Sequence, residues 1–264
     1  MDAYKLKMIA VIGMVLNHIV IGWQEIIPFW LMFPLTAAGG LTFPIMAYFA
    51  VEGYKYTSNL GKYIGRLAIV GLISAPFHAL TFGVIQPNIM FSIIWGLLAL
   101  KMYDKLNKVL FFVLLIPMLI IAFILPMDLY ILNILLMLLF YTIKREGLRR
   151  TLPPILAGVI MLFLTGSAAF NIWHLSNLAP YSEEAYSVLQ VFQASLGRMG
   201  NFNIMMSGTT YIIGAVVASI LLFRFNGQRG KQAKWLFYVS YPLHFVIIGL
   251  VALAMGWATF PFIQ

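Results

Sequence analysis

The feature that most constrains this chain is a succession of apolar runs, each about as long as a membrane crossing requires. The runs can be placed at 4–22, 36–56, 61–82, 88–103, 108–125, 128–143, 152–170, 206–224 and 234–257. A helix crosses the hydrocarbon core of a bilayer with about 20 predominantly apolar residues. With 62% hydrophobic and 9% charged residues, and a mean hydropathy of +0.94, the chain cannot present the polar surface of a soluble domain. The sequence therefore predicts an all-α, polytopic integral membrane protein with about nine transmembrane helices, folded as a single domain over residues 1–264.

The basic residues predict how this bundle is oriented. Sixteen of the seventeen Lys and Arg residues fall in connections on one side of the predicted spans, and only Arg198 falls on the other side. Cytoplasmic connections are enriched in Lys and Arg, so we expect a cytoplasmic N-terminus and an outer C-terminus. The long connection 171–205 is then extracytoplasmic. Because topology explains the formal charge of +9, membrane lipids are the expected neighbours and nucleic acid is not an expected partner.

Two histidines interrupt the first and the last apolar runs. His18 and His244 each lie about ten residues from the cytoplasmic end of their span, so both are predicted near mid-membrane. Ionisable groups at that depth are costly and commonly functional. One imidazole could deprotonate a nucleophile while the other fixes its tautomer. Alternatively, each ring only packs between helices and bonds a neighbouring carbonyl. Lys7 precedes His18 by eleven residues, which places it on the same helix face about 16 Å away.

A second group of charged residues is predicted at the cytoplasmic ends of two neighbouring spans. Glu52 closes the second span and Arg66 opens the third, so a tight hairpin would bring them together. They would form either an ion pair between helices or part of an acid/base relay. Lys55, Lys62 and Arg66 surround the hairpin and would suit the phosphates of a cytoplasmic cofactor, although a purely topogenic role explains them equally well.

Further candidates lie toward the outer side of the predicted bundle. His78 lines the outer half of a cavity or packs beside a proline kink. Asp128 caps the sixth span or contacts a substrate. Trp173 belongs to the long connection 171–205, which serves as a lid or as a spacer. With Tyr241 in the last span, these residues are our candidates for substrate binding.

Several classes of site are excluded by what the sequence lacks. There is no cysteine, hence no disulfide, no thiolate metal site and no cysteine nucleophile. Neither HExxH, nor a glycine-rich phosphate loop, nor a GxSxG nucleophile elbow occurs, and no metal site is predicted. Acid/base chemistry at mid-membrane is the chemistry that remains.

Four ordered motifs resemble the TraX family of membrane acetyltransferases, which is named for the enzyme that acetylates the N-terminus of conjugative pilin. They are LKMIA at 6–10 with MVLNH at 14–18, LTFPIMAYFAVEGY at 41–54, NIMFS at 88–92 and FYVSYPLH at 237–244. The resemblance covers almost the whole chain. It also leads us to expect Asp-His in the first span, where this chain has Asn17-His18. Asparagine can orient an imidazole by hydrogen bonding but supplies no charge.

The resemblance implies an enzyme in the bacterial cytoplasmic membrane that moves an acetyl group from cytoplasmic acetyl-CoA to an acceptor amine at the outer face. The acceptor would be the N-terminus of a pilin, another exported peptide or a lipoprotein. His18 would act as general base with Asn17 and His244 orienting it, and Glu52 would hold Arg66 or join the relay. The cofactor-binding candidates are Lys7, Lys55, Lys62 and Arg66.

Other functions fit the same residues. An extracellular glycan hydroxyl could replace the amine as acceptor. A proton-coupled secondary transporter could use His18, His78 and His244 as a proton path. A non-catalytic membrane scaffold would use none of them.

Overall fold

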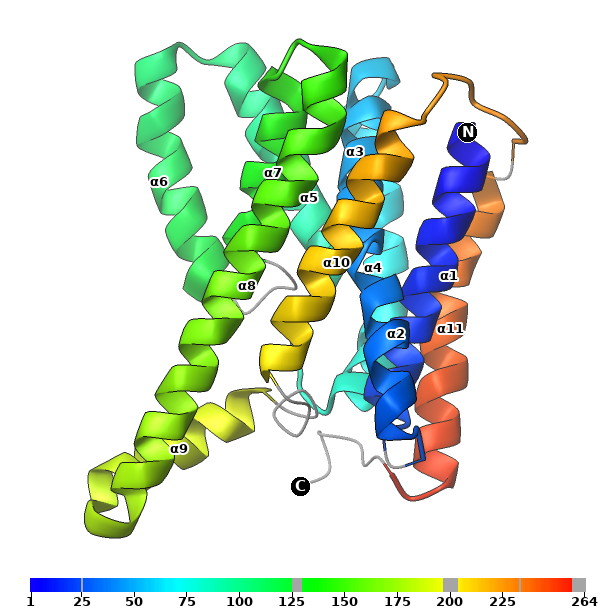
Figure 1. The fold of residues 1–264 in the computed structure, drawn as a ribbon. Coiled ribbons are helices and arrows are strands. Elements are labelled where there is room, and N and C mark those ends of the chain that lie inside the picture. The colour runs from blue at the N-terminus through cyan, green and yellow to red at the C-terminus, as the bar shows by residue number, and fades with distance from the viewer. Residues whose placement is uncertain (25, 125–129, 197–203, 233, 258–264) are drawn as a thin grey trace.

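The chain forms a bundle of helices in which α2 and α3 together make one pass across the bundle (Figure 1). The computed structural model describes residues 1–24, 26–124, 130–196, 204–232 and 234–257, and these contain no β-strand. The helices are α1 (Ala3–Gly22), α2 (Phe29–Gly40), α3 (Thr42–Tyr56), α4 (Leu60–Phe82), α5 (Ile89–Lys105), α6 (Lys108–Ile124), α7 (Tyr130–Thr142), α8 (Glu146–Leu178), the 3₁₀ turn η1 (Ala179–Tyr181), α9 (Glu183–Leu196), α10 (Ile204–Phe223) and α11 (Lys234–Ala254). The predicted all-α class is confirmed.

Within the part of the chain that the structure describes, five stretches are long and apolar enough to cross a membrane: Ala3–Gly22, Phe29–Tyr56, Leu60–Phe82, Glu146–Tyr181 and Trp235–Ala254. Shorter apolar helices lie beside them at Lys108–Ala122, Ile131–Thr142 and Gly208–Phe223. The outer surface of α6 exposes large apolar side chains in every turn, among them Val109, Phe112, Ile116 and Ile120. A surface of this kind is stable against lipid tails and not against water, so the chain is a multi-pass membrane protein.

Short polar side chains explain where several helices begin. The Asp2 carboxylate accepts a hydrogen bond from the Lys5 backbone N–H at the start of α1, at 2.8 Å. The Asn59 side chain accepts from the Lys62 N–H at the start of α4, at 2.9 Å. Each cap satisfies one of the four N–H groups that a helix start leaves unpaired.

One end of the bundle carries the basic connections and is called the basic end below. It holds the N-terminus and the α3–α4, α5–α6, α7–α8 and α10–α11 connections (Figure 1). These are the connections that carry Lys and Arg in the sequence. The gathering of cations at one end is what the sequence predicted.

Two predicted boundaries are wrong. The second span begins at Phe29 and not at residue 36, because Pro34 lies in the second turn of α2 without ending it, and α3 continues the same pass beyond Leu41. The connection 171–205 is largely helical: α8 continues to Leu178, and α9 follows the η1 turn. Residues 171–178 contain no Gly or Pro, and α8 ends at Leu178, shortly before Pro180, which has no backbone N–H to continue the α-helical hydrogen bonds.

The packing of α1 against α2 positions the functional site. The two helices are antiparallel, and the Thr42 hydroxyl of α3 donates to the Ala10 carbonyl at 2.8 Å. A side chain at Gly13 would collide with the Ala38 backbone, and one at Gly39 would collide with the Asn17 side chain. Glycine at both positions therefore allows a close approach of the helices.

Candidate functional site

The two histidines predicted to share one depth lie against each other. His18 Nδ1 is 2.7 Å from His244 Nε2, and the rings are stacked with centroids 4.9 Å apart. His244 Nδ1 is 3.0 Å from the Ser240 carbonyl oxygen. A carbonyl only accepts, so His244 Nδ1 carries hydrogen and His244 Nε2 accepts from the N–H of His18 Nδ1. This chain of bonds leaves the lone pair of His18 on Nε2, where it can take up a proton.

An aromatic shell surrounds the pair. His18 contacts the edge of Phe82 and stacks on Phe245, with centroid distances of 5.6 and 4.7 Å. His78 is fully buried, stacks on Phe82 at 4.5 Å, and is absent from the described cavity wall. Of the two predictions for His78, the structure agrees with packing and not with direct contact to a substrate in this cavity.

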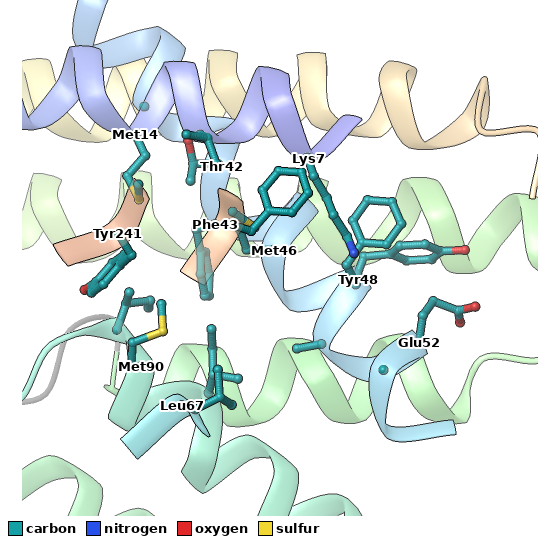
Figure 2. A pocket seen from close by; sticks show the side chains of 18 of the residues that line it. Lys7, Met14, Thr42, Phe43, Met46, Tyr48, Glu52, Leu67, Met90 and Tyr241 are labelled. Carbon is teal, nitrogen blue, oxygen red and sulfur yellow. The ribbon is translucent and has the colours of Figure 1, made fainter. Parts of the chain in front are cut away.

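A large cavity connects the histidine pair with the basic end. Its volume is about 1710 Å³, and both His18 and Asn17 line it. Figure 2 shows Met14 and Tyr241 toward one end of the cavity, and Lys7 and Glu52 toward the other. Apolar side chains form most of the wall between these ends. An extended molecule with an anionic head and a reactive tail would match this distribution.

The mouth of the cavity at the basic end is strongly cationic. Six Lys and Arg side chains and two carboxylates line the cavity, a formal excess of four positive charges: Lys7, Lys55, Arg149, Arg150, Arg229 and Lys231 against Glu52 and Glu146. Lys7 Nζ lies 4.8 Å from the centroid of the Phe49 ring and has no carboxylate partner among the described residues. An unpaired ammonium on an aromatic face is available to an anionic ligand.

Two of the predicted cofactor-binding residues are not part of this mouth. Lys62 and Arg66 are absent from the described cavity wall, whereas Lys7 and Lys55 line it. Lys62 follows the Asn59 cap on an exposed turn of α4. The cations that take their place come from the start of α8 and from the α10–α11 connection.

Glu52 belongs to an ion cluster that joins three helices. Its carboxylate accepts from Arg149 of α8 and lies 3.5 Å from Lys55 Nζ. Arg149 also donates to Glu146 at 2.9 Å and to the carbonyl of Phe140 in α7. Arg149 is only 3% exposed, so three acceptors surround a buried guanidinium. The cluster fixes the basic ends of α3, α7 and α8 relative to one another.

This cluster corrects the predicted pairing of Glu52 with Arg66. Among the described residues Glu52 pairs with Arg149 and Lys55. Arg66 is not its partner, although Arg66 is much closer to Glu52 in sequence than Arg149 is. A hairpin fixes which helix ends are adjacent but leaves open the rotation of each helix about its axis. Here the rotation turns Glu52 toward α8.

Asn17 does not hold His18. No hydrogen bond joins their side chains in the described structure, and the partner of His18 Nδ1 is His244. Successive helical residues point about 100° apart, so Asn17 turns to α2, where it packs on Gly39 and lines the cavity. Among the described residues Asn17 therefore makes no hydrogen bond through which it could orient His18, whereas His244 is in contact with the ring.

The other candidates for substrate binding divide between the cavity and the surface. Tyr241 is buried and lines the cavity one turn before His244. Trp173 is 63% exposed on α8, and the described cavity wall does not include it. Asp128 lies outside the described residues.

The residues that the sequence prediction missed are Arg149, Arg150, Arg229 and Lys231. All four were read as signals of topology, because each stands in a cluster of basic residues at a span end. One signal was present in the sequence: Glu146 precedes Arg149 and Arg150 by three and four residues, the spacing of ion pairs on one helix face. That spacing marks the start of α8 as more than a flexible basic connection.

Comparison with known proteins places this chain in a family. Residues 3–252 match the family described as TraX protein. The chain is 25% identical over 262 residues to the probable fimbrial assembly protein FimC, serogroup H1, of Dichelobacter nodosus, and the match covers 94% of each chain. No solved structure matches the chain.

Proposed function

Because the chain belongs to the TraX family, we propose that it is a membrane-embedded acetyltransferase that carries an acetyl group from acetyl-CoA to an acceptor amine. The observation that carries this proposal is the cavity that begins at six cations and ends at His18. The phosphates of acetyl-CoA would bind at the basic end. Its pantetheine arm would then lie along the apolar wall of the cavity and point toward the histidine pair.

The topology of the proposal follows from the charge distribution. We place the basic end in the cytoplasm, with nine crossings and an outer C-terminus, in the cytoplasmic membrane of a bacterium. Acetyl-CoA is made and used in the cytoplasm, so the cationic mouth would face its source. The acceptor would reach the histidine pair from the outer side.

The role of the chain's own residues follows from the direction of the hydrogen bonds. His18 Nε2 would take the proton from the attacking amine while His244 Nε2 receives the N–H of the same imidazole. The Ser240 carbonyl fixes the ring of His244, and His244 in turn orients His18, so two successive hydrogen bonds set the orientation of the base. A free α-amino group has a pKa of about 8, so a base of imidazole strength can assist its attack on a thioester.

The acceptor we propose is the free N-terminus of an exported peptide, a pilin or a lipoprotein. The relative in Dichelobacter nodosus is named as a fimbrial assembly protein, which supports a pilus subunit or another exported protein as acceptor. A glycan hydroxyl would need the same base and the same thioester. Mass spectrometry of exported proteins, from cells with and without this chain, would identify the acetylated group.

The decisive variant is His18→Ala. We expect transfer of labelled acetyl from acetyl-CoA to fall on the order of 10²- to 10⁴-fold, the usual contribution of a general base. His174→Ala is the matched control, because His174 is an exposed imidazole on α8 whose one ring contact among the described residues is with Phe170. Full activity of a folded His18→Ala protein would refute the proposed base. Solute flux coupled to pH without any dependence on acetyl-CoA would favour a transporter instead.

A further inference from the structure

Thr36 on α2 carries a buried hydroxyl that faces the cavity without a partner. The residue is 6% exposed and lines the cavity wall. Its Oγ1 makes no hydrogen bond within the described structure. A buried hydroxyl in an apolar wall is costly unless it is hydrogen-bonded. The hydroxyl is therefore placed for a group that occupies the cavity.

Thr36 differs in this respect from other threonines of the same wall. Thr42 donates to the Ala10 carbonyl at 2.8 Å, and Thr165 donates to the carbonyl of Met161 in its own helix at 2.7 Å. Both hydroxyls are satisfied by the protein. The hydroxyls of Thr42 and Thr165 are thus bonded to protein carbonyls, whereas the hydroxyl of Thr36 is not.

Asn17 is a second polar side chain that faces the cavity with no hydrogen-bond partner in the described structure. Its contact with Gly39 places it on the α2 side of α1. In the antiparallel arrangement Ala10 is level with Thr42, and Gly13 is level with Ala38. Asn17 packs directly on Gly39, and Thr36 lies three residues before Gly39, about one turn along α2. The amide and the hydroxyl therefore lie within about one helical turn of each other on facing helices, and both line the same cavity as His18.

We propose that Asn17 and Thr36 form a subsite for the carbonyl oxygen of the acyl group, with the Asn17 amide N–H and the Thr36 hydroxyl as hydrogen-bond donors. The inference rests on the proposed acetyl transfer and adds to it the residues that would stabilise the oxyanion. Donors that are already in place when negative charge develops give one of the largest rate contributions in acyl transfer.

The subsite completes a balanced reaction. The amine nitrogen attacks the thioester carbon and forms the new C–N bond, while the carbonyl electron pair moves onto the oxygen. This oxygen accepts a hydrogen bond from each of the two donors. The amine proton passes to His18 Nε2. The carbonyl re-forms as the C–S bond breaks, and the proton held by His18 neutralises the departing thiolate to give CoA and an amide.

The experiment compares four threonine variants in proteoliposomes supplied with acetyl-CoA and a synthetic peptide that has a free N-terminal amino group. Thr36→Val keeps the shape and removes the donor, and we expect kcat to fall on the order of 10²-fold. Thr36→Ser restores the donor and should recover most of kcat. Thr142→Val and Thr142→Ser make the same changes outside the described cavity wall, where the hydroxyl already donates to the Leu138 carbonyl at 2.8 Å, and kcat should stay within about twofold of the wild type.

The binding of CoA separates this role from a structural one. CoA lacks the acyl carbonyl, so its Kd should be unchanged in Thr36→Val and in Asn17→Ala. A normal kcat in folded Thr36→Val would overturn the subsite, and equal loss in the valine and serine variants would do the same. If Thr36→Val is active while His18→Ala is not, the subsite fails and the acetyltransferase stands. If the wild-type protein transfers nothing, the proposed function itself fails.

Discussion

Replacing Glu52 by Gln tests whether the ion cluster at the basic end holds the bundle together. The substitution keeps the size of the side chain but leaves Arg149, which is 3% exposed, with Glu146 as its remaining carboxylate partner. Removing one partner of a fully buried pair costs about 3–5 kcal/mol. Glu52 is 20% exposed and Gln still accepts a neutral hydrogen bond, so we expect a loss of about 2–3 kcal/mol in the free energy of unfolding.

The matched control is Glu146→Gln, which removes the other carboxylate from the same guanidinium. The Glu146 side chain is 55% exposed, so solvent screens its pairing and the expected cost is about 0–1 kcal/mol. Reversible unfolding in mixed micelles would measure both variants against the wild type. A Glu52→Gln protein that is no less stable than Glu146→Gln would refute the reasoning, because burial would then not decide the strength of the pair.

Two further predictions concern the site. His244→Ala removes the acceptor of the His18 Nδ1–H, and we expect kcat to fall about 10²-fold with unchanged CoA binding and an altered pH–rate profile. His244→Gln can still accept this hydrogen bond and should recover part of the rate. Equal loss in both variants would contradict a positioning role. Lys7→Met should raise the KM for acetyl-CoA about tenfold through the loss of a charge-assisted hydrogen bond, whereas Lys62→Met should leave KM unchanged, and the opposite ranking would place the phosphates elsewhere.

The features that the sequence predicted well depend on local patterns. The apolar runs at 4–22 and 61–82 correspond within one residue to α1 and α4, because length and hydropathy act along a single helix. Depth is also local: counting residues from the basic end placed His18 and His244 in one layer, and His18 Nδ1 lies 2.7 Å from His244 Nε2. Depth along a helix is fixed by its rise per residue.

The features that were missed depend on how each helix is rotated. Arg149 is separated from Glu52 by 97 residues, and no periodicity within either segment indicates that they face each other. The same holds for Asn17, whose position beside His18 suggested a shared role. Adjacent residues on a helix face different neighbours, so the helix that packs against each side decides what it does.

The contact between His18 and His244 joins the first and the last of the described helices. As the chain is synthesised and inserted, α1 enters the membrane long before α11 has been made. During this time the imidazole of His18 lacks His244, the acceptor that sets its tautomer. A fragment that ends before Lys234 would contain the cationic mouth and the base but not the group that orients the base. Assembly of the histidine pair is thus coupled to completion of the bundle, and under the proposed function the intermediates of membrane insertion would transfer acetyl groups only slowly.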